Sequence, residues 1–194
     1  MKIIRKEYDE LVFSNLLAHY FMQSPEVFAT FCKEILGIES IDKNYTIERE
    51  TQDNIDLLIR DSKNVIVIEN KIKSGINGIR HDVYSDEIQS QLCKYHDFAT
   101  AIAKGRAVSC FIFSPDYNYL DIANHKANQY YKVIKYSELY NFFIKQDVTV
   151  FDKYFDDFRK ALYKHTLMVD SELFEEMRRR FATRILKVNG ANNP

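Results

Sequence analysis

Hydrophobic and polar positions change their spacing along this chain of 194 residues. Before residue 37, apolar side chains recur every three or four positions, which predicts two helices. Ser24 and Pro25 have the residue types of an N-cap and a first helical position, and Gly37 is placed to end the second helix. The spacing then shortens, and runs rich in Ile and Val predict a meander of three strands at 41–50, 54–60 and 65–70.

The next part of the chain alternates helix and strand. A helix is predicted from Ser85 to Gly105, before a nearly continuous apolar strand at 107–113. Strand, helix and strand form a βαβ unit, so we expect the strand at 107–113 to run parallel to that at 65–70. Further predicted elements are a strand at 129–135, a short helix capped by Ser137, and helices at about 148–165 and 171–187.

Three charged residues, Asp56, Glu69 and Lys71, interrupt two of the predicted strands. Charged side chains rarely enter such strands without a partner or a metal, because their desolvation is costly. Residues two apart share one face of a strand, so Glu69 and Lys71 project together. If Ser62-Lys63 is a two-residue hairpin turn, Asp56 lies opposite Glu69, with Cβ atoms about 4.5–5.5 Å apart. A register slip of one residue would separate the two acids.

Two opposed, half-buried carboxylates repel each other and raise each other's pKa. A divalent cation between them turns that repulsion into ligation, and Mg²⁺ prefers one or two carboxylates together with waters and phosphate oxygens. A lysine beside such a site can hold the attacking water or stabilise the charge that develops during phosphodiester hydrolysis. The structural alternative is an ion pair of Glu69 with Lys71 at a strand end, with Asp56 at a solvated edge.

Gln91 adds a polar side chain to the apolar stripe of the next predicted helix, and Tyr95 follows it one helical turn later. The Gln91 amide could orient a water or a phosphate near a metal. The alternative is a boundary glutamine that hydrogen-bonds to backbone.

These residues resemble the PD-(D/E)XK nuclease superfamily. The matching elements are Asp56, the triplet Glu69-Asn70-Lys71, and the Q-x-x-x-Y pair of Gln91 and Tyr95. The resemblance covers about residues 7–135, in particular a bacterial branch with I-D-L-L-I, I-E-N-K and Q-L-x-x-Y blocks. It implies an α/β fold with a restriction-endonuclease-like core (α-β-β-β-α-β), a central mixed sheet flanked by helices, and additional C-terminal helices.

The resemblance also implies a function: metal-dependent cleavage of phosphodiester bonds, with DNA as the favoured substrate, in an endo- or exonucleolytic manner. Asp56 and Glu69 would bind Mg²⁺ or Mn²⁺, and Lys71 would position the attacking water. Ile55 stands where the nominal motif has proline. Such families often carry another acid on the first helix, for which Glu10 is our candidate. Its rivals are Glu7, Glu48 and Glu50, and each of the four could equally be a surface glutamate.

Composition limits the other functions that the chain could have. The net charge of −1 argues against a polycation that coats nucleic acid. Three widely spaced cysteines, the lack of a signal-peptide pattern and the lack of a long apolar run suit a cytoplasmic protein that uses no membrane. We expect one nuclease-like domain over 1–194, with a core at about 7–135, a helical extension at about 137–188 and a disordered tail at 189–194.

The basic residues near the C-terminus have two interpretations. Arg178, Arg179, Arg180, Arg184 and Lys187 form either a solvated helix face or a surface that contacts phosphates, with a homodimer among the options. For the whole protein, two alternatives to a nuclease remain open. One is a catalytically inactive nuclease-like fold that binds nucleic acid or protein, and the other is a scaffold whose strand charges are structural ion pairs.

Overall fold

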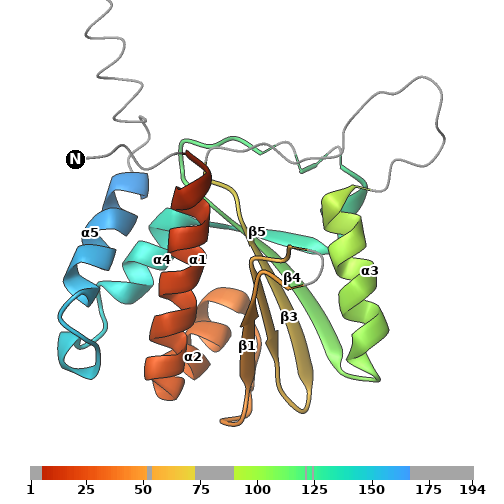
Figure 1. Ribbon diagram of the computed structural model, residues 1–194, viewed down its shortest axis with the longest axis horizontal. Helices are drawn as coiled ribbons and strands as arrows, with labels where there is room; N and C mark the ends of the chain where they lie inside the picture. Colours follow the sequence, from red (N-terminus) through yellow and green to blue (C-terminus); the bar gives the residue numbers. More distant parts are fainter. Residues whose placement is uncertain (1–5, 52–53, 73–89, 121, 124, 167–194) are drawn as a thin grey trace, which may run out of the picture.

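A five-stranded sheet with helices on both sides organises the computed structural model, which describes residues 6–51, 54–72, 90–120, 122–123 and 125–166 (Figure 1). The helices are α1 (Lys6–Gln23), α2 (Pro25–Phe31), which continues as the π-helical turn η1 (Cys32–Leu36), α3 (Gln91–Ala103), α4 (Tyr136–Phe143) and α5 (Phe155–Thr166), with 3₁₀ turns η2 (Lys126–Gln129) and η3 (Val148–Val150). The strands are β1 (Thr46–Arg49), β2 (Leu57–Arg60), β3 (Asn64–Asn70), β4 (Ala107–Ser114) and β5 (Tyr131–Lys135).

The sheet is mixed, and its strands are ordered β1-β2-β3-β4-β5. β1, β2 and β3 form an antiparallel meander, whereas β4 runs parallel to β3 and β5 runs parallel to β4. The predicted meander and the predicted parallel pairing of β3 with β4 are therefore confirmed. This topology makes β3 a central strand whose C-terminal end, at Asn70, lies beside the end of β4.

Two hydrophobic cores lie on the two faces of the sheet (Figure 1). On one face, which we call the α1 face, alternate β-strand residues such as Ile66 and Ile68 pack with α1, α2, α4 and α5. On the other, the α3 face, Val65 and Val67 pack with α3. Every residue of β3 is buried, because helices cover both of its sides.

Local signals set several element boundaries as predicted. Ser24 is the N-cap of α2 and Pro25 its first residue, and Gly37 follows the π-helical turn in a left-handed conformation at φ 74°. The described part of α3 begins at Gln91 with Ser90 as its N-cap, and the predicted start at Ser85 lies outside the described residues.

The prediction that Ser137 caps α4 is wrong. Lys135 is the N-cap, and Ser137 lies in the first turn, where its N–H and hydroxyl both donate to the carboxylate of Asp116. The backbone of β5 continues directly into the helix, so the serine falls two residues inside it. The predicted helix at 171–187, its basic residues and the tail at 189–194 lie outside the described residues.

Candidate active site

The turn between β2 and β3 is held by the carboxylate of Asp61. Its Oδ1 accepts hydrogen bonds from the backbone N–H of Lys63 at 2.7 Å and of Asn64 at 2.5 Å, and Oδ2 accepts from the N–H of Asp42 at 2.7 Å. Burial opposes ionisation of Asp61, but these bonds outweigh it and hold the pKa of this carboxyl below its ordinary value. An ionised Asp61 thus fixes a two-residue turn at Ser62 and Lys63.

This turn sets the register that brings the two candidate metal ligands together. Leu57 pairs with Ile68 and Leu58 pairs with Val67, as the predicted hairpin requires. Asp56 directly precedes β2, so continuing the same register places it opposite Glu69. Asp56 Oδ2 accepts a hydrogen bond from the backbone N–H of Asn70 at 2.7 Å, which holds its carboxylate at the end of β3.

Glu69 and Lys71 project from the α3 face at the end of β3. Lys71 Nζ lies 2.6 Å from Glu69 Oε1, and both residues are buried. The other oxygen, Glu69 Oε2, is buried and has no hydrogen-bond partner among the described residues. The Lys71 backbone is fixed as well, because its N–H donates to Phe113 at 2.8 Å and its carbonyl accepts from Asn118 Nδ2 at 2.8 Å.

The two acids stand in an environment that disfavours their joint ionisation. Burial and, next, the charge of Glu69 raise the pKa of Asp56 to about 7, against the lowering effects of the Asn70 N–H and of Lys71. Burial also raises the pKa of Glu69, and Lys71 opposes that rise. Without another cation, the ammonium group of Lys71 is the one positive charge next to the buried carboxylates of Asp56 and Glu69 among the described residues of the site.

Glu10 reaches this site from α1. Its Oε1 accepts a hydrogen bond at 2.7 Å from the N–H of Ile72, the residue after Lys71. The charge of Glu10 contributes to the raised pKa of Asp56 and of Glu69.

The rivals of Glu10 are placed differently. Glu48 lies on β1 and forms an ion pair with Arg60 of β2, and Glu50 is exposed after the end of β1. The side chain of Glu7 lies outside the described part of the structure. Among the glutamates considered, Glu10 is the one whose side chain the structure places at the end of β3.

Gln91 and Tyr95 continue the site along α3. Lys71 Nζ donates to Gln91 Oε1 at 3.5 Å, Gln91 Nε2 donates to the hydroxyl of Tyr95, and that hydroxyl donates to the carbonyl of Asn54 at 2.9 Å. Asn54 lies two residues before Asp56. The chain of hydrogen bonds therefore joins the lysine to the segment that carries the first acid.

Residues on the α1 face also contact the site, and their sequence pattern assigned them no role. Asn70 is fully buried, and its side chain bonds to Ser14 of α1 and Tyr136 of α4. Asn70 stands at a position where the neighbouring residues of the same face, Ile66 and Ile68, are apolar. A polar residue at a strand position whose face is otherwise apolar is the sequence feature that indicates such a buried contact for Asn70.

The donors present at the site fit a divalent cation of the Mg²⁺ type. Among the described residues, no group of three or more His, Cys, Asp or Glu side chains is arranged to hold a metal ion. Mg²⁺, however, is usually held by one or two carboxylates with waters and phosphate oxygens. Asp56 and Glu69 supply two carboxylates, and the buried Glu69 Oε2 is an oxygen that lacks a described partner.

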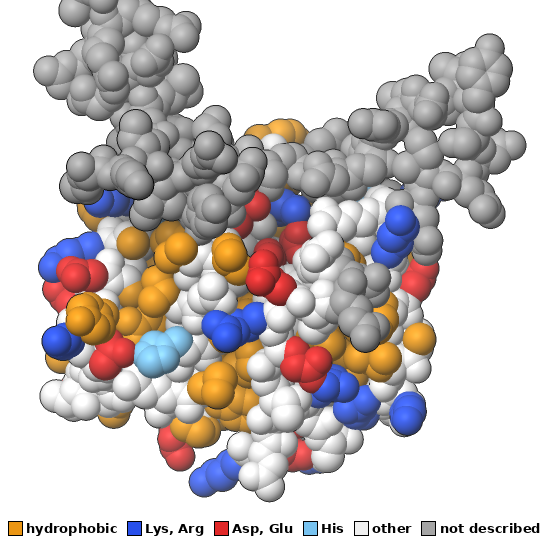
Figure 2. Space-filling view, in the orientation of Figure 1, with side chains coloured by type: hydrophobic (Ala, Val, Ile, Leu, Met, Phe, Trp, Pro, Cys, Tyr) orange, Lys and Arg blue, Asp and Glu red, His pale blue; other side chains and the backbone are white. Residues whose placement is uncertain are grey.

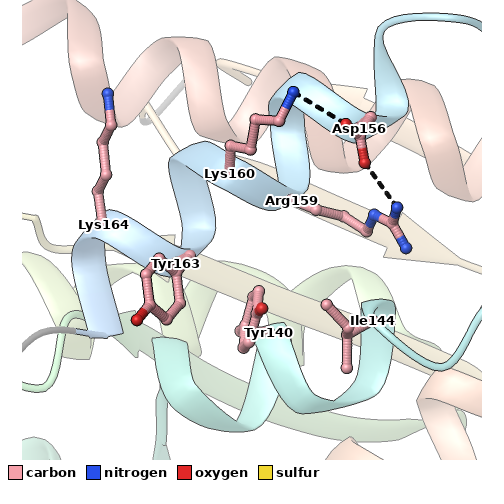
Figure 3. A pocket seen from close by; sticks show the side chains of 7 residues that line it. All are labelled: Tyr140, Ile144, Asp156, Arg159, Lys160, Tyr163 and Lys164. Carbon is pink, nitrogen blue, oxygen red and sulfur yellow. Dashed lines mark hydrogen bonds and ion pairs between the residues drawn. The ribbon is translucent and has the colours of Figure 1, made fainter.

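A separate cavity of about 450 Å³ lies between α4 and α5, in the layer that covers the α1 face (Figure 3). Its acid, Asp156, forms ion pairs with Arg159 at 2.6 Å and Lys160 at 2.9 Å. It contains none of the predicted site residues; its lining is Tyr140, Ile144, Asp156, Arg159, Lys160, Tyr163 and Lys164. Because none of the predicted site residues lines it, this cavity is not the candidate active site.

A mixed sheet flanked by helices, with Asp, Glu and Lys gathered at the end of its central strand, defines a restriction-endonuclease-like α/β fold. The family model of the PD-(D/E)XK nuclease superfamily matches residues 1–149. The chain belongs to the PD-(D/E)XK nuclease superfamily. No curated protein and no solved structure gives a match.

Membership places the chain in a superfamily of phosphodiesterase nucleases, whose members generally use divalent metal ions and act on nucleic acid. None of the described helices is long and apolar enough to cross a lipid bilayer. The catalytic roles of Asp56, Glu69, Lys71, Gln91 and Glu10 stay predictions, since family membership does not assign them.

Proposed function

We propose that the protein is a Mg²⁺- or Mn²⁺-dependent nuclease that hydrolyses phosphodiester bonds of DNA. The observation that carries this proposal is the buried Glu69 Oε2, which lacks a described partner and belongs to the carboxylate opposite Asp56. Two carboxylates that disfavour each other's ionisation, next to one lysine, form a site that gains from an additional cation.

Each residue has a separate role in this proposal. Asp56 and Glu69 would hold the metal, which when bound supplies Lewis-acid polarisation of the scissile phosphate and of a water. Lys71 holds the attacking water by a hydrogen bond and stabilises the negative charge that grows on the phosphoryl oxygens. Gln91, whose amide already contacts Lys71, orients the lysine toward that charge.

Glu10 has a supporting role. Its carboxylate accepts the hydrogen bond of the Ile72 N–H and so fixes the backbone that follows Lys71. It also adds negative charge near the two metal-binding acids, which increases their attraction for a cation.

The surface charges support recognition by local contacts rather than by a highly basic surface. On the face shown in Figure 2, the coloured acidic and basic side chains are interspersed, in keeping with the net charge of −1. A nuclease needs positive charge only where phosphates approach, and in this proposal Lys71 supplies that charge.

The direct test is cleavage of supercoiled, linear and single-stranded DNA, with single-stranded and duplex RNA in parallel, by the purified full chain with Mn²⁺ or Mg²⁺. We expect cleavage of DNA that EDTA abolishes and that E69Q and K71M reduce by about 100-fold or more. Matched surface variants, E39Q and K94M, are expected to leave cleavage unchanged, because both side chains are exposed and lie outside the site.

Two results would contradict the proposal. Cleavage that persists at the wild-type rate in E69Q and K71M would show that another site is responsible. A calorimetric titration without Mn²⁺ uptake, together with no cleavage, would favour the alternative of an inactive nuclease-like fold that binds nucleic acid or protein. Cleavage of RNA alone would overturn the assignment of DNA while leaving the site intact.

A further inference from the structure

A buried network of hydrogen bonds crosses the α1 face directly behind the candidate active site. The hydroxyl of Tyr136 donates to Asn70 Oδ1 at 3.2 Å, Asn70 Nδ2 donates to Ser14 Oγ at 2.6 Å, and Ser14 Oγ donates to the carbonyl of Glu10 at 2.9 Å. Tyr136 and Asn70 are fully buried and Ser14 is 1% exposed. The network thus links α4, β3 and α1 through three side chains.

Two residues of this network also contact the candidate active site, Asn70 through its backbone N–H and Glu10 through its carboxylate. The backbone N–H of Asn70 donates to Asp56, and the carboxylate of Glu10 accepts from the N–H of Ile72. Asn70 lies between Glu69 and Lys71 and points to the opposite face of the sheet from them. Its side chain therefore holds the short backbone segment that carries both charged groups.

We propose that Asn70, clamped by Ser14 and Tyr136, is a positioning residue that sets the geometry of the candidate metal and lysine site from behind the sheet. This inference rests on the proposed function of that site. In this proposal the Asn70 side chain does not contact the substrate, and it acts through the backbone of residues 69–71.

Two physical arguments separate this role from ordinary core packing. The α1 face of β3 is otherwise apolar at Ile66 and Ile68, and an aliphatic residue at position 70 could fill the same core without a buried amide. A buried polar group is costly unless it is fully paired, and a paired network specifies one arrangement of the elements that it joins. Hydrophobic contacts do not fix position in this way, since they are not directional.

The position of the network explains what must be fixed. Glu69 is the last residue but one of β3, and Lys71 directly follows the strand, which ends at Asn70. β2 ends its pairing at Leu57, so the antiparallel partner does not hold residues 69–71. On this side of β3, two hydrogen bonds take the place of strand pairing: the N–H of Asn70 donates to Asp56, and the N–H of Ile72 donates to Glu10.

The test uses three variants of the full chain that each remove one hydroxyl: S14A, Y136F and the matched control Y45F. The hydroxyl of Tyr45 donates to the carbonyl of Phe21 in the same core and contacts no residue of the site. We expect S14A and Y136F to lower kcat for DNA cleavage by about 10-fold each with KM changed by less than twofold. They should also weaken Mn²⁺ binding in calorimetry without substrate.

Y45F is expected to lower thermal stability to a similar extent as Y136F and to leave kcat and Mn²⁺ affinity unchanged. Equal kcat and equal Mn²⁺ affinity in all three variants would overturn the positioning role and leave Asn70 as a core residue. A loss that appears only in KM would also overturn it, because that result would place the network in substrate binding.

A readout independent of activity keeps this test separate from that of the proposed function. Amide hydrogen exchange at Asn70 and Ile72 reports the two hydrogen bonds to Asp56 and Glu10 in the protein as it stands. We expect faster exchange at both amides in S14A and Y136F and not in Y45F. Unchanged exchange there would refute the clamp even if the wild type cleaves DNA, and faster exchange in a protein that cleaves nothing would refute only the nuclease.

Discussion

Lys71 Nζ lies 2.6 Å from Glu69 Oε1, with 5% of the lysine side chain and 4% of the glutamate side chain exposed. Removing one partner of a buried ion pair leaves an uncompensated charge, whereas replacing both partners can be nearly neutral for stability. Substitution of both residues therefore distinguishes an ion pair with only a structural role from one that takes part in catalysis.

We expect K71M to lower the free energy of unfolding by about 2–4 kcal/mol, because it leaves two buried carboxylates without an ammonium group, and E69Q to lower it by less, because Asp56 still faces Lys71. The E69Q/K71M double variant should lose less than the sum of the two. Cleavage should be reduced by about 100-fold or more in all three. The measurements are urea denaturation and a DNA cleavage assay. A double variant that regains activity together with stability would show that the pair has only a structural role.

Asp56 predicts a pH dependence of stability for the metal-free protein. Its pKa is about 7 in the folded protein and 3.8 ordinarily, so between these values the folded state binds a proton that the unfolded state lacks. Stability should then fall as the pH rises from about 4 to about 7. D56N should remove the part of this fall that Asp56 causes, and above pH 7 it should be more stable than the wild type by on the order of 2–4 kcal/mol. Denaturation from pH 4 to 8 in EDTA measures this fall, and D157N, at an exposed position of α5, is the control.

A divalent cation should reverse that penalty. Because it binds the folded site and not the unfolded chain, Mn²⁺ at about 100 times its Kd should add about 2.7 kcal/mol, or roughly 5–10 °C in Tm. D56N and E69Q should lose most of this shift, and E39Q should keep it. Thermal unfolding with and without Mn²⁺ measures the effect, and an equal shift in D56N would place the metal elsewhere.

The turn at Asp61 should control both stability and the site. D61A removes the acceptor of the backbone hydrogen bonds from Asp42, Lys63 and Asn64, so we expect a loss of about 2–4 kcal/mol. Because the pKa of Asp61 lies below its ordinary value, this contribution is present above the ordinary aspartate pKa and is lost as the pH falls below it. Chemical denaturation at pH 7 and pH 3 measures it.

The control for the turn is S62A, which removes the exposed hydroxyl that donates to the Asp42 carboxylate and leaves the acceptors of the backbone hydrogen bonds in place, and it should alter stability by about 1 kcal/mol or less. D61A should also weaken Mn²⁺ binding, because a slipped register separates Asp56 from Glu69. Wild-type Mn²⁺ affinity in D61A would show that the register does not depend on this turn.

Tyr95 should support Gln91 without joining the chemistry. Y95F removes the hydroxyl that accepts from Gln91 and donates to Asn54, which should cost about 1–2 kcal/mol of stability and lower kcat about 10-fold. The matched variant Y131F removes a hydroxyl bonded to the Leu92 carbonyl of the same helix. Stability should fall in both variants and kcat only in Y95F, as steady-state kinetics would measure.

The hairpin was predictable from sequence because its signals are local. Apolar runs, a polar two-residue turn at Ser62-Lys63 and the position of Asp56 gave a register that the pairing of Leu57 with Ile68 confirms. The parallel pairing of β3 with β4 followed from the intervening helix in the same way. The start of α4 did not follow, because Ser137 has the residue type of an N-cap while the continuity of β5 with α4 moved the cap to Lys135.

The sequence by itself determined the strand pair, the face shared by Glu69 and Lys71, and the family, because the two-residue repeat of a strand, turn residues and short motifs are properties of neighbouring residues. The tertiary structure decided which glutamate comes to the end of β3. Glu10 is 62 residues from Ile72 along the chain, and only the packing of α1 on the sheet brings them together. It also decided the role of Asn70, whose partners Ser14 and Tyr136 are distant in sequence, so no local pattern could reveal that they meet.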